Sequence, residues 1–155
     1  MAYAEDTKVP FERSLSEIVS LVRKAGAKNI AQFEGDNYFA IQFESADRLI
    51  RFKIPFPCLG DMPTRDGRGA SLSVKQRESK LDQSRRSRGR ALLLVIKAKL
   101  ESVESGIETF EQAFLANVVM SDGSTVYERV ASPLAIEYQT GRPAAATGLL
   151  PPPRQ

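Results

Sequence analysis

Basic side chains gather in one stretch of this chain, in a pattern suited to binding phosphates. Eleven of its 22 lysines and arginines lie between Arg65 and Lys99, together with only three acids. A clustered positive field raises the local concentration of polyanions, whereas a surface of mixed charge does not. The rest of the chain carries more acids than bases, although the net charge of the whole is +3. This separation of charge indicates a nucleic-acid partner.

A row of cations is predicted if this stretch is helical. At about 100° per residue, four side chains share one helical face and two more widen it. They are Lys75, Arg86, Arg90 and Lys97, with Arg85 and Arg88 beside them. Positive charge early in a helix opposes the helix dipole, so a bound anion would compensate it. The alternative is a solvated, partly frayed helix.

A second candidate surface lies on two segments, 38–44 and 48–54, in which apolar and polar residues alternate. Such alternation is typical of half-buried strands. The face turned away from the core would carry Tyr38, Gln42, Arg51 and Lys53. An aromatic ring beside cations can stack on the bases and neutralise the phosphates of single-stranded nucleic acid. The alternative is an ordinary solvated sheet surface.

Four glutamates give the chain its most enzyme-like pattern. Two Glu-x-x-Glu pairs on one helix face could present oxygen ligands to magnesium. They are Glu101, Glu104, Glu108 and Glu111. The alternative is a solvated helix surface, since Lys97 can pair with Glu101.

The chain has no histidine, which excludes imidazole-based triads and the common zinc sites. We therefore predict that the protein is not an enzyme and needs no cofactor.

The elements that would position these residues begin with a helix and a small sheet. Ser14 and Glu17 have the spacing of a capping box, which predicts that a first helix begins at Ser14. A strand near 28–34 and turn residues at 35–37 precede the two alternating segments. The three strands would then form an antiparallel meander.

A long helix is predicted after a loop at 57–71, which is rich in Gly and Pro and which we expect to be mobile. The helix is basic first and amphipathic later, with an apolar seam from Leu93 to Phe114 that Gly106 would kink or break. No apolar face continues backwards through Gly89. The arginine-rich part is therefore expected to project past the core.

The C-terminal part is less regular. Asp122 and Gly123 would either turn a short hairpin or lead into a helix over 125–138, and the sequence leaves both open. Residues 141–155 are rich in Ala, Pro and Gly and are expected to form an extended tail. The predicted organisation is a single α+β domain over 1–140, with an N-terminal helix, a three-stranded antiparallel meander, a long basic and amphipathic helix, and a short C-terminal helical segment.

Cysteine content and apolar runs bear on the cellular compartment. The single cysteine, Cys58, cannot form an internal disulfide, which favours a reducing compartment. The chain starts without the basic and apolar pattern of a secretory leader. Its longest apolar run, from Ala91 to Ile96, is far shorter than the roughly 20 residues that cross a bilayer. We expect a cytoplasmic protein without membrane contact.

Several short motifs occur together along the second half of the chain. They are Arg90-Ala91-Leu92, the run from Ile96 to Glu101, Val103-Glu104, Phe110-Glu111, Phe114-Leu115, Asp122-Gly123, Tyr138 and Thr140-Gly141. In this set the chain resembles a family of small uncharacterised proteins encoded by tailed bacteriophages, over most of its length. A tryptophan is common in that pattern where this chain has Gly89. The resemblance implies a product that works in the host bacterial cytoplasm, and it implies no activity.

We interpret the sequence as that of a nucleic-acid-binding protein without sequence specificity, which prefers single-stranded DNA and acts as a homo-oligomer. The predicted phosphate contacts are Arg85, Arg86, Arg88, Arg90 and Lys97, with Tyr38, Arg51 and Lys53 as a stacking surface. The first alternative is a protein-interaction module that binds a host or phage partner through the long helix or the proline-rich tail. The second is a magnesium-dependent nucleotide hydrolase built on the glutamates.

Overall fold

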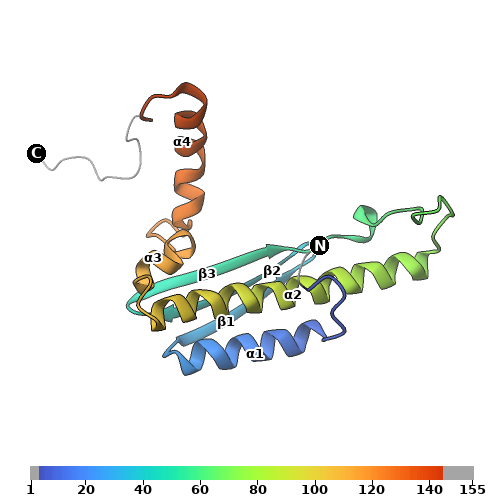
Figure 1. The fold of residues 1–155 in the computed structure, drawn as a ribbon, viewed down its shortest axis with the longest axis horizontal. Coiled ribbons are helices and arrows are strands. Elements are labelled where there is room, and N and C mark those ends of the chain that lie inside the picture. The colour runs from blue at the N-terminus through green and yellow to red at the C-terminus, as the bar shows by residue number, and fades with distance from the viewer. Residues whose placement is uncertain (1–3, 145–155) are drawn as a thin grey trace, which may run out of the picture.

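The structure is a computed structural model; it describes residues 4–144 and confirms the predicted α+β class (Figure 1). Its elements, in chain order, are α1 (Phe11–Lys24), β1 (Lys28–Gly35), β2 (Tyr38–Ser45), β3 (Arg48–Pro55), the 3-10 turn η1 (Leu59–Asp61), α2 (Val74–Glu104), α3 (Phe110–Phe114), the 3-10 turn η2 (Leu115–Asn117) and α4 (Val126–Thr140). None of the helices in the described range is long and apolar enough to cross a membrane.

The three strands form the antiparallel meander expected from their alternation, in the order β1, β2, β3. The first hairpin turn is two residues long, since Gly35 pairs with Tyr38. In the second turn both residues have positive φ, 49° at Ala46 and 56° at Asp47, as a tight hairpin requires. Such short turns fix the register and therefore decide which side chains share a face.

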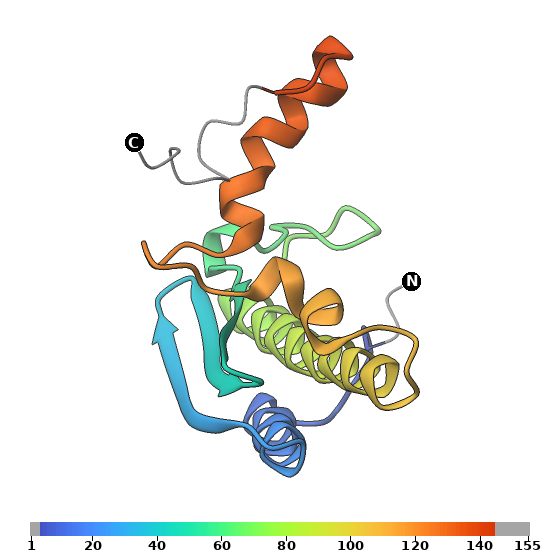
Figure 2. The same cartoon turned by 90° about the vertical axis from the view of Figure 1, so that its left-hand side faces the viewer.

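One face of the sheet is covered by α1 and α2 (Figures 1 and 2). The alternation of the strands predicts six residues that point inward. Five of them are buried there, namely Phe39, Ile41, Phe43, Ile50 and Phe52, and the sixth, Ile54, is half-buried. From α2, Leu93 and Ile96 join the same cluster. The apolar side chains that recur at every second strand residue therefore pack in one core with those that recur at the helical period in α2.

The start of α1 differs from the prediction. The helix begins at Phe11 after Pro10, and Ser14 lies inside the helix with its hydroxyl fully buried rather than acting as a cap. The Phe11 ring packs edge-on against Phe39 and Phe56, with centroids 5.1 Å apart in each pair. This aromatic contact holds an additional helical turn against the sheet, which a local capping pattern does not reveal.

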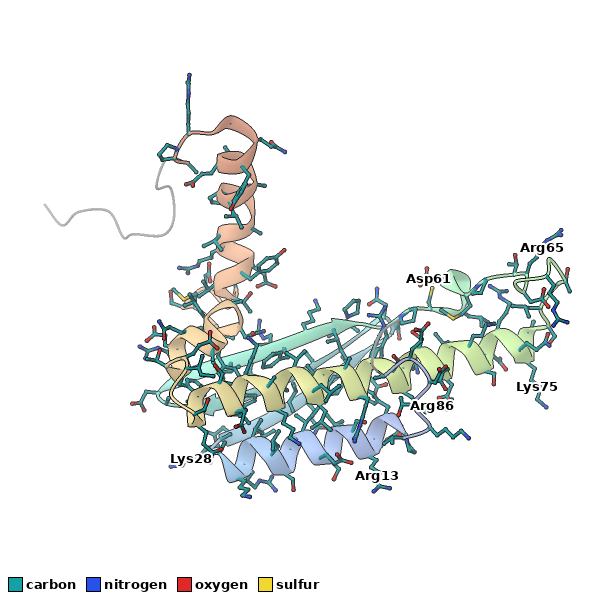
Figure 3. The ribbon with its side chains drawn as sticks, viewed as in Figure 1. Arg13, Lys28, Asp61, Arg65, Lys75 and Arg86 are labelled. Carbon is teal, nitrogen blue, oxygen red and sulfur yellow. The ribbon has the colours of Figure 1, made fainter. Side chains whose placement is uncertain are left out.

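The prediction that the arginine-rich part of α2 projects past the core is wrong around Gly89. Gly89 is buried, and a Cβ atom at this position would lie only 2.6 Å from Cδ2 of Phe11. The absent side chain lets α1 approach α2 closely, so the apolar interface continues where no apolar side chain stands. Only the start of α2 extends beyond the sheet. Figure 3 shows Lys75 in the first turn of α2 and Arg65 in the preceding loop, both far from the sheet.

The apolar seam of α2 is divided between two helices. α2 ends at Glu104, and Gly106 has a φ of 74°, a left-handed conformation that turns the chain. Phe114 then returns to the core on α3, where it is completely buried beside Phe43 and Phe52. Most of the seam is thus covered within one chain, whereas Ile107, in the connection to α3, is 79% exposed.

After α3 the chain forms both the short turn at Asp122-Gly123 and the following helix, which the sequence left open as alternatives. Val119 pairs with Thr125 across the Asp122-Gly123 turn, and Thr125 then caps α4, with its hydroxyl accepting the Glu128 N–H. None of the residues of α4 is buried, and the helix rises away from the sheet (Figure 1).

The loop at 57–71 contains its own hydrogen-bonded turn. Asp66 accepts hydrogen bonds from the N–H groups of Arg68 and Ala70, and Arg77 of α2 donates to the Leu59 carbonyl. Whether the loop is mobile stays a prediction. The predicted extended tail lies outside the described residues beyond Ala144.

The unpaired Ser14 hydroxyl gives a test of this packing. We expect Ser14→Ala to stabilise the protein by about 1 kcal/mol, because burying a hydroxyl without a hydrogen-bond partner costs free energy. Urea denaturation measures the change, and Ser16→Ala on the exposed side of α1 controls for helix propensity. A loss of stability greater than that of the control would contradict the assignment.

Candidate nucleic-acid interface

Of the cation row predicted on α2, Arg90 reaches α1, whereas Lys75 lies at the far end of α2, beyond α1 (Figure 3). Arg90 forms an ion pair with Glu17 of α1, with 2.9 Å between Nη1 and Oε2. Arg86 pairs with Asp82 one turn earlier and also donates to Gln83. Two cations of the row therefore already have acidic partners within the protein.

The arginines beside the row differ in their surroundings. The Arg85 guanidinium lies 5.2 Å from the centroid of the Phe56 ring, and its Nε is buried without a hydrogen-bond partner. Arg88 forms no ion pair with the residues that the structure describes, and it borders a groove of about 570 Å³ beside Lys80 and Ser84. Lys97 is exposed and likewise has no acidic partner in residues 4–144. Of the five predicted contacts on α2, only Arg88 and Lys97 keep their charge unengaged.

The predicted stacking surface, by contrast, is assembled on the open face of the sheet. The Lys53 ammonium lies 4.5 Å from the centroid of the Tyr38 ring. The ring itself lies across Gly35 of the neighbouring strand, where a Cβ atom would clash with it. Arg51 donates to Gln42 and to the Gly123 carbonyl, which ties the sheet to the turn before α4.

Tyr38, Arg51 and Lys53 line a cleft of about 490 Å³ between the open face and the start of α4. A second aromatic residue, Tyr127, enters the cleft from the first turn of α4 and is 60% exposed. The volume falls in the range of small-ligand sites, roughly 300–1,000 Å³. Two phenol rings and two cations around one cleft can hold a planar base and a phosphate together.

Sequence reasoning missed two aromatic residues of this surface. Phe33 lies opposite Ala40 in the register, so it shares the open face with Tyr38, and its side chain is 48% exposed. The two-residue turn could have revealed this, since it fixes the alternation of β1 from that of β2. Nothing local could have revealed Tyr127, because the path of the chain after α3 brings it to the sheet.

The acidic pattern does not form the predicted helix face. Because α2 ends at Glu104, Glu108 lies in the connection to α3, where it accepts a hydrogen bond from Ser102. Glu111 lies on α3 and is 3.6 Å from Arg48. Among residues 4–144 no group of three acidic or cysteine side chains is arranged to hold a metal ion.

The turn that positions α4 is fixed by Asp122. Its carboxylate accepts hydrogen bonds from the Ser124 hydroxyl and N–H and from Arg129. These bonds, with that of Ser124 the strongest, hold the pKa of Asp122 well below its usual value of 3.8. The charged carboxylate thus stabilises the turn that brings Tyr127 to the cleft.

We expect Asp122→Asn to be less stable than the wild type at pH 7. Because the folded-state pKa is lowered, the wild-type advantage is present above the ordinary aspartate pKa and is lost as the pH falls through the lowered value. Urea denaturation over an acid series measures the difference. A difference that stays constant along the series would show that the charge of Asp122 is not involved.

Comparisons with known proteins add no relative to this picture. No protein-family model, curated protein or solved structure matches the chain. The resemblance to phage proteins therefore stays a prediction, and the argument for function depends on the residues of the cleft and of the open sheet face.

Proposed function

We propose that the protein binds single-stranded nucleic acid, preferably DNA, without sequence specificity, through the open sheet face and its cleft. The observation that carries this proposal is the grouping of Tyr38, Arg51, Lys53 and Tyr127 around one opening. Aromatic rings accept any base, because every base has a π-face, and cations beside them track the phosphates. Phe33 extends the aromatic surface onto β1.

Lys53 and Tyr38 would exchange partners when a strand binds. An exposed cation–π contact is worth about 0.5–1 kcal/mol, whereas a base stacked on an aromatic side chain is worth about 1–3 kcal/mol. A base that stacks on Tyr38 therefore displaces the Lys53 ammonium favourably. The released ammonium is then free to pair with a phosphate.

The remaining free cations of α2 belong to a different layer. α2, which carries Lys97, packs on the covered face of the sheet (Figure 2). The cleft is lined by Tyr38, Arg51 and Lys53 on the other face. A single nucleic-acid strand bound in the cleft therefore does not need a contact with Lys97. This separation distinguishes binding by the open face from binding by the helix row.

Fluorescence anisotropy with a labelled single-stranded oligonucleotide tests the proposal. We expect the affinity to fall as the salt concentration rises. For single strands each phosphate contact makes the slope of log K against log[salt] steeper by about 0.7. Lys53→Glu should weaken binding about tenfold, and Tyr38→Ala should cost about 1–3 kcal/mol. Lys97→Glu, the matched charge reversal on α2, should bind like the wild type.

Two results would contradict the open-face proposal. Equal losses of affinity in Lys53→Glu and Lys97→Glu would mean either that the nucleic acid binds α2 or that binding depends only on net charge. Absence of binding by the wild type at low salt would remove the function altogether. Reversal of Arg86 or Arg90 is a poorer test, because it also breaks an internal ion pair.

A further inference from the structure

Strand β1 is an edge strand whose outer side is open. The sheet has the order β1, β2, β3, so β1 pairs with β2 on one side and with no described strand on the other. Figure 2 shows β1 at the outer edge of the sheet. The free side of β3 is partly covered, because Ile50 forms a bridge with Val118. An open strand edge presents unpaired N–H and C=O groups that can pair with another chain.

The hydrogen bonds of the sheet decide which residues of β1 turn their backbone groups outward. The Asn37 carbonyl accepts the N–H of Phe56 at 2.7 Å, so Asn37 bonds to the β3 side. Because alternate residues of a strand bond to opposite neighbours, Tyr38 bonds toward β1. Its partner on β1 is Gly35.

The same alternation continues along β1 from Gly35. Phe33 also bonds to β2, whereas Gln32 and Glu34 direct their N–H and C=O groups to the open edge. The side chains of Gln32 and Glu34 are both exposed. A strand added at this edge would therefore form its backbone hydrogen bonds with these two residues.

The regular part of β1 is centred on Phe33. The pairing with β2 shifts in register between Lys28 and Ala31, and it is regular from Ala31 to Gly35. Since such a shift disrupts the ladder locally, an added strand would pair with the regular part. Positions 31–35 contain neither a lysine nor a proline, the residues that often protect an exposed edge. The Phe33 side chain is 48% exposed.

We propose that two copies of this chain pair through β1, antiparallel and about a twofold axis at Phe33, so that the three strands of each copy form one continuous sheet. Matching the two regular parts end to end places Phe33 opposite Phe33 of the second copy. Gln32 of each copy then lies opposite Glu34 of the other, and each such pair exchanges N–H···O bonds.

The side chains make this contact self-complementary. The Gln32 amide faces a Glu34 carboxylate, so no like charges lie directly opposite each other. The two Phe33 rings form an aromatic cross-strand pair, which stabilises a sheet. An unrelated strand could use the same backbone groups, but the match of these side chains favours a second copy.

The twofold axis is perpendicular to the sheet, so both open faces lie on the same side of the dimer. The surfaces formed by Tyr38 and Lys53 in the two copies would flank the central pair of Phe33 rings. The dimer does not depend on the proposed function. If that function holds, both clefts meet nucleic acid from one side.

Light scattering of the full-length protein without nucleic acid tests the dimer. The contact is small and weak association is expected, so the concentration series extends to about 1 mM. The mass should rise from 17.1 kDa toward twice this value. Phe33→Lys and Phe33→Glu should each remain monomeric, because like charges would lie opposite each other, and their equimolar mixture should recover the dimer. Val95→Lys, at a similarly exposed position of α2, should dimerise like the wild type.

Three results would overturn the proposal. The first is a wild type that stays monomeric up to about 1 mM. The second is a Phe33→Lys variant that dimerises as well as the wild type, since the interface would then lie elsewhere. The third is a mixture of the two charge variants that stays monomeric although circular dichroism shows both to be folded.

Disulfide trapping tests the register independently. In a Cys58→Ser background, which removes the exposed native thiol, Phe33→Cys should cross-link under mild oxidation. A directly opposed pair without mutual hydrogen bonds has its Cα atoms about 4.5 Å apart, within the range of about 4.4–6.8 Å that disulfides need. Ala31→Cys, the matched control, should not cross-link, because its two copies would lie about 14 Å apart.

Equal cross-linking of Phe33→Cys and Ala31→Cys would indicate random collision and overturn the register. So would a Phe33→Cys protein that dimerises without cross-linking. None of these measurements contains nucleic acid, so failure of the dimer and failure of the proposed function give separate results.

Discussion

The close approach of α1 and α2 at Gly89 is the contact on which the rest of the molecule depends. Because position 89 has no side chain, Phe11 can lie against α2 while it packs on Phe39 and Phe56. α1 and α2 are thereby held on the same face of the sheet. A larger residue at position 89 would require Phe11 to move.

This packing also decides what the arginines do. On an isolated helix they would form a free basic row, but in the fold Arg90 pairs with Glu17 of α1 and Arg85 lies over Phe56, which follows β3. The charges of Arg85 and Arg90 are thus engaged within the protein, whereas Arg88 has no ion-pair partner among residues 4–144. The opposite face of the sheet stays open, and there Lys53 and Arg51 surround a cleft that α4 completes.

Much of the fold was predictable because it follows local periodicity. Alternation in 38–44 and 48–54 identified the strands and their buried side chains, and the seam from Leu93 identified the buried face of α2. The start of α1 was not predictable in the same way, because Phe11 is held by rings from distant strands. The end of α2 was only partly indicated by Gly106, whose effect depended on Phe114 returning to the core.

The sequence by itself determined the α+β class, the core residues of 38–44 and 48–54 and the grouping of Tyr38, Arg51 and Lys53 on one sheet face, since these depend on patterns within single segments. Tertiary structure decided which cations are free and brought Tyr127 to the cleft. The physical reason is that a periodic pattern states which side chains share a face, whereas the partner of that face comes from residues far away in the chain. Glu17 and Arg90, 73 positions apart, show this most directly.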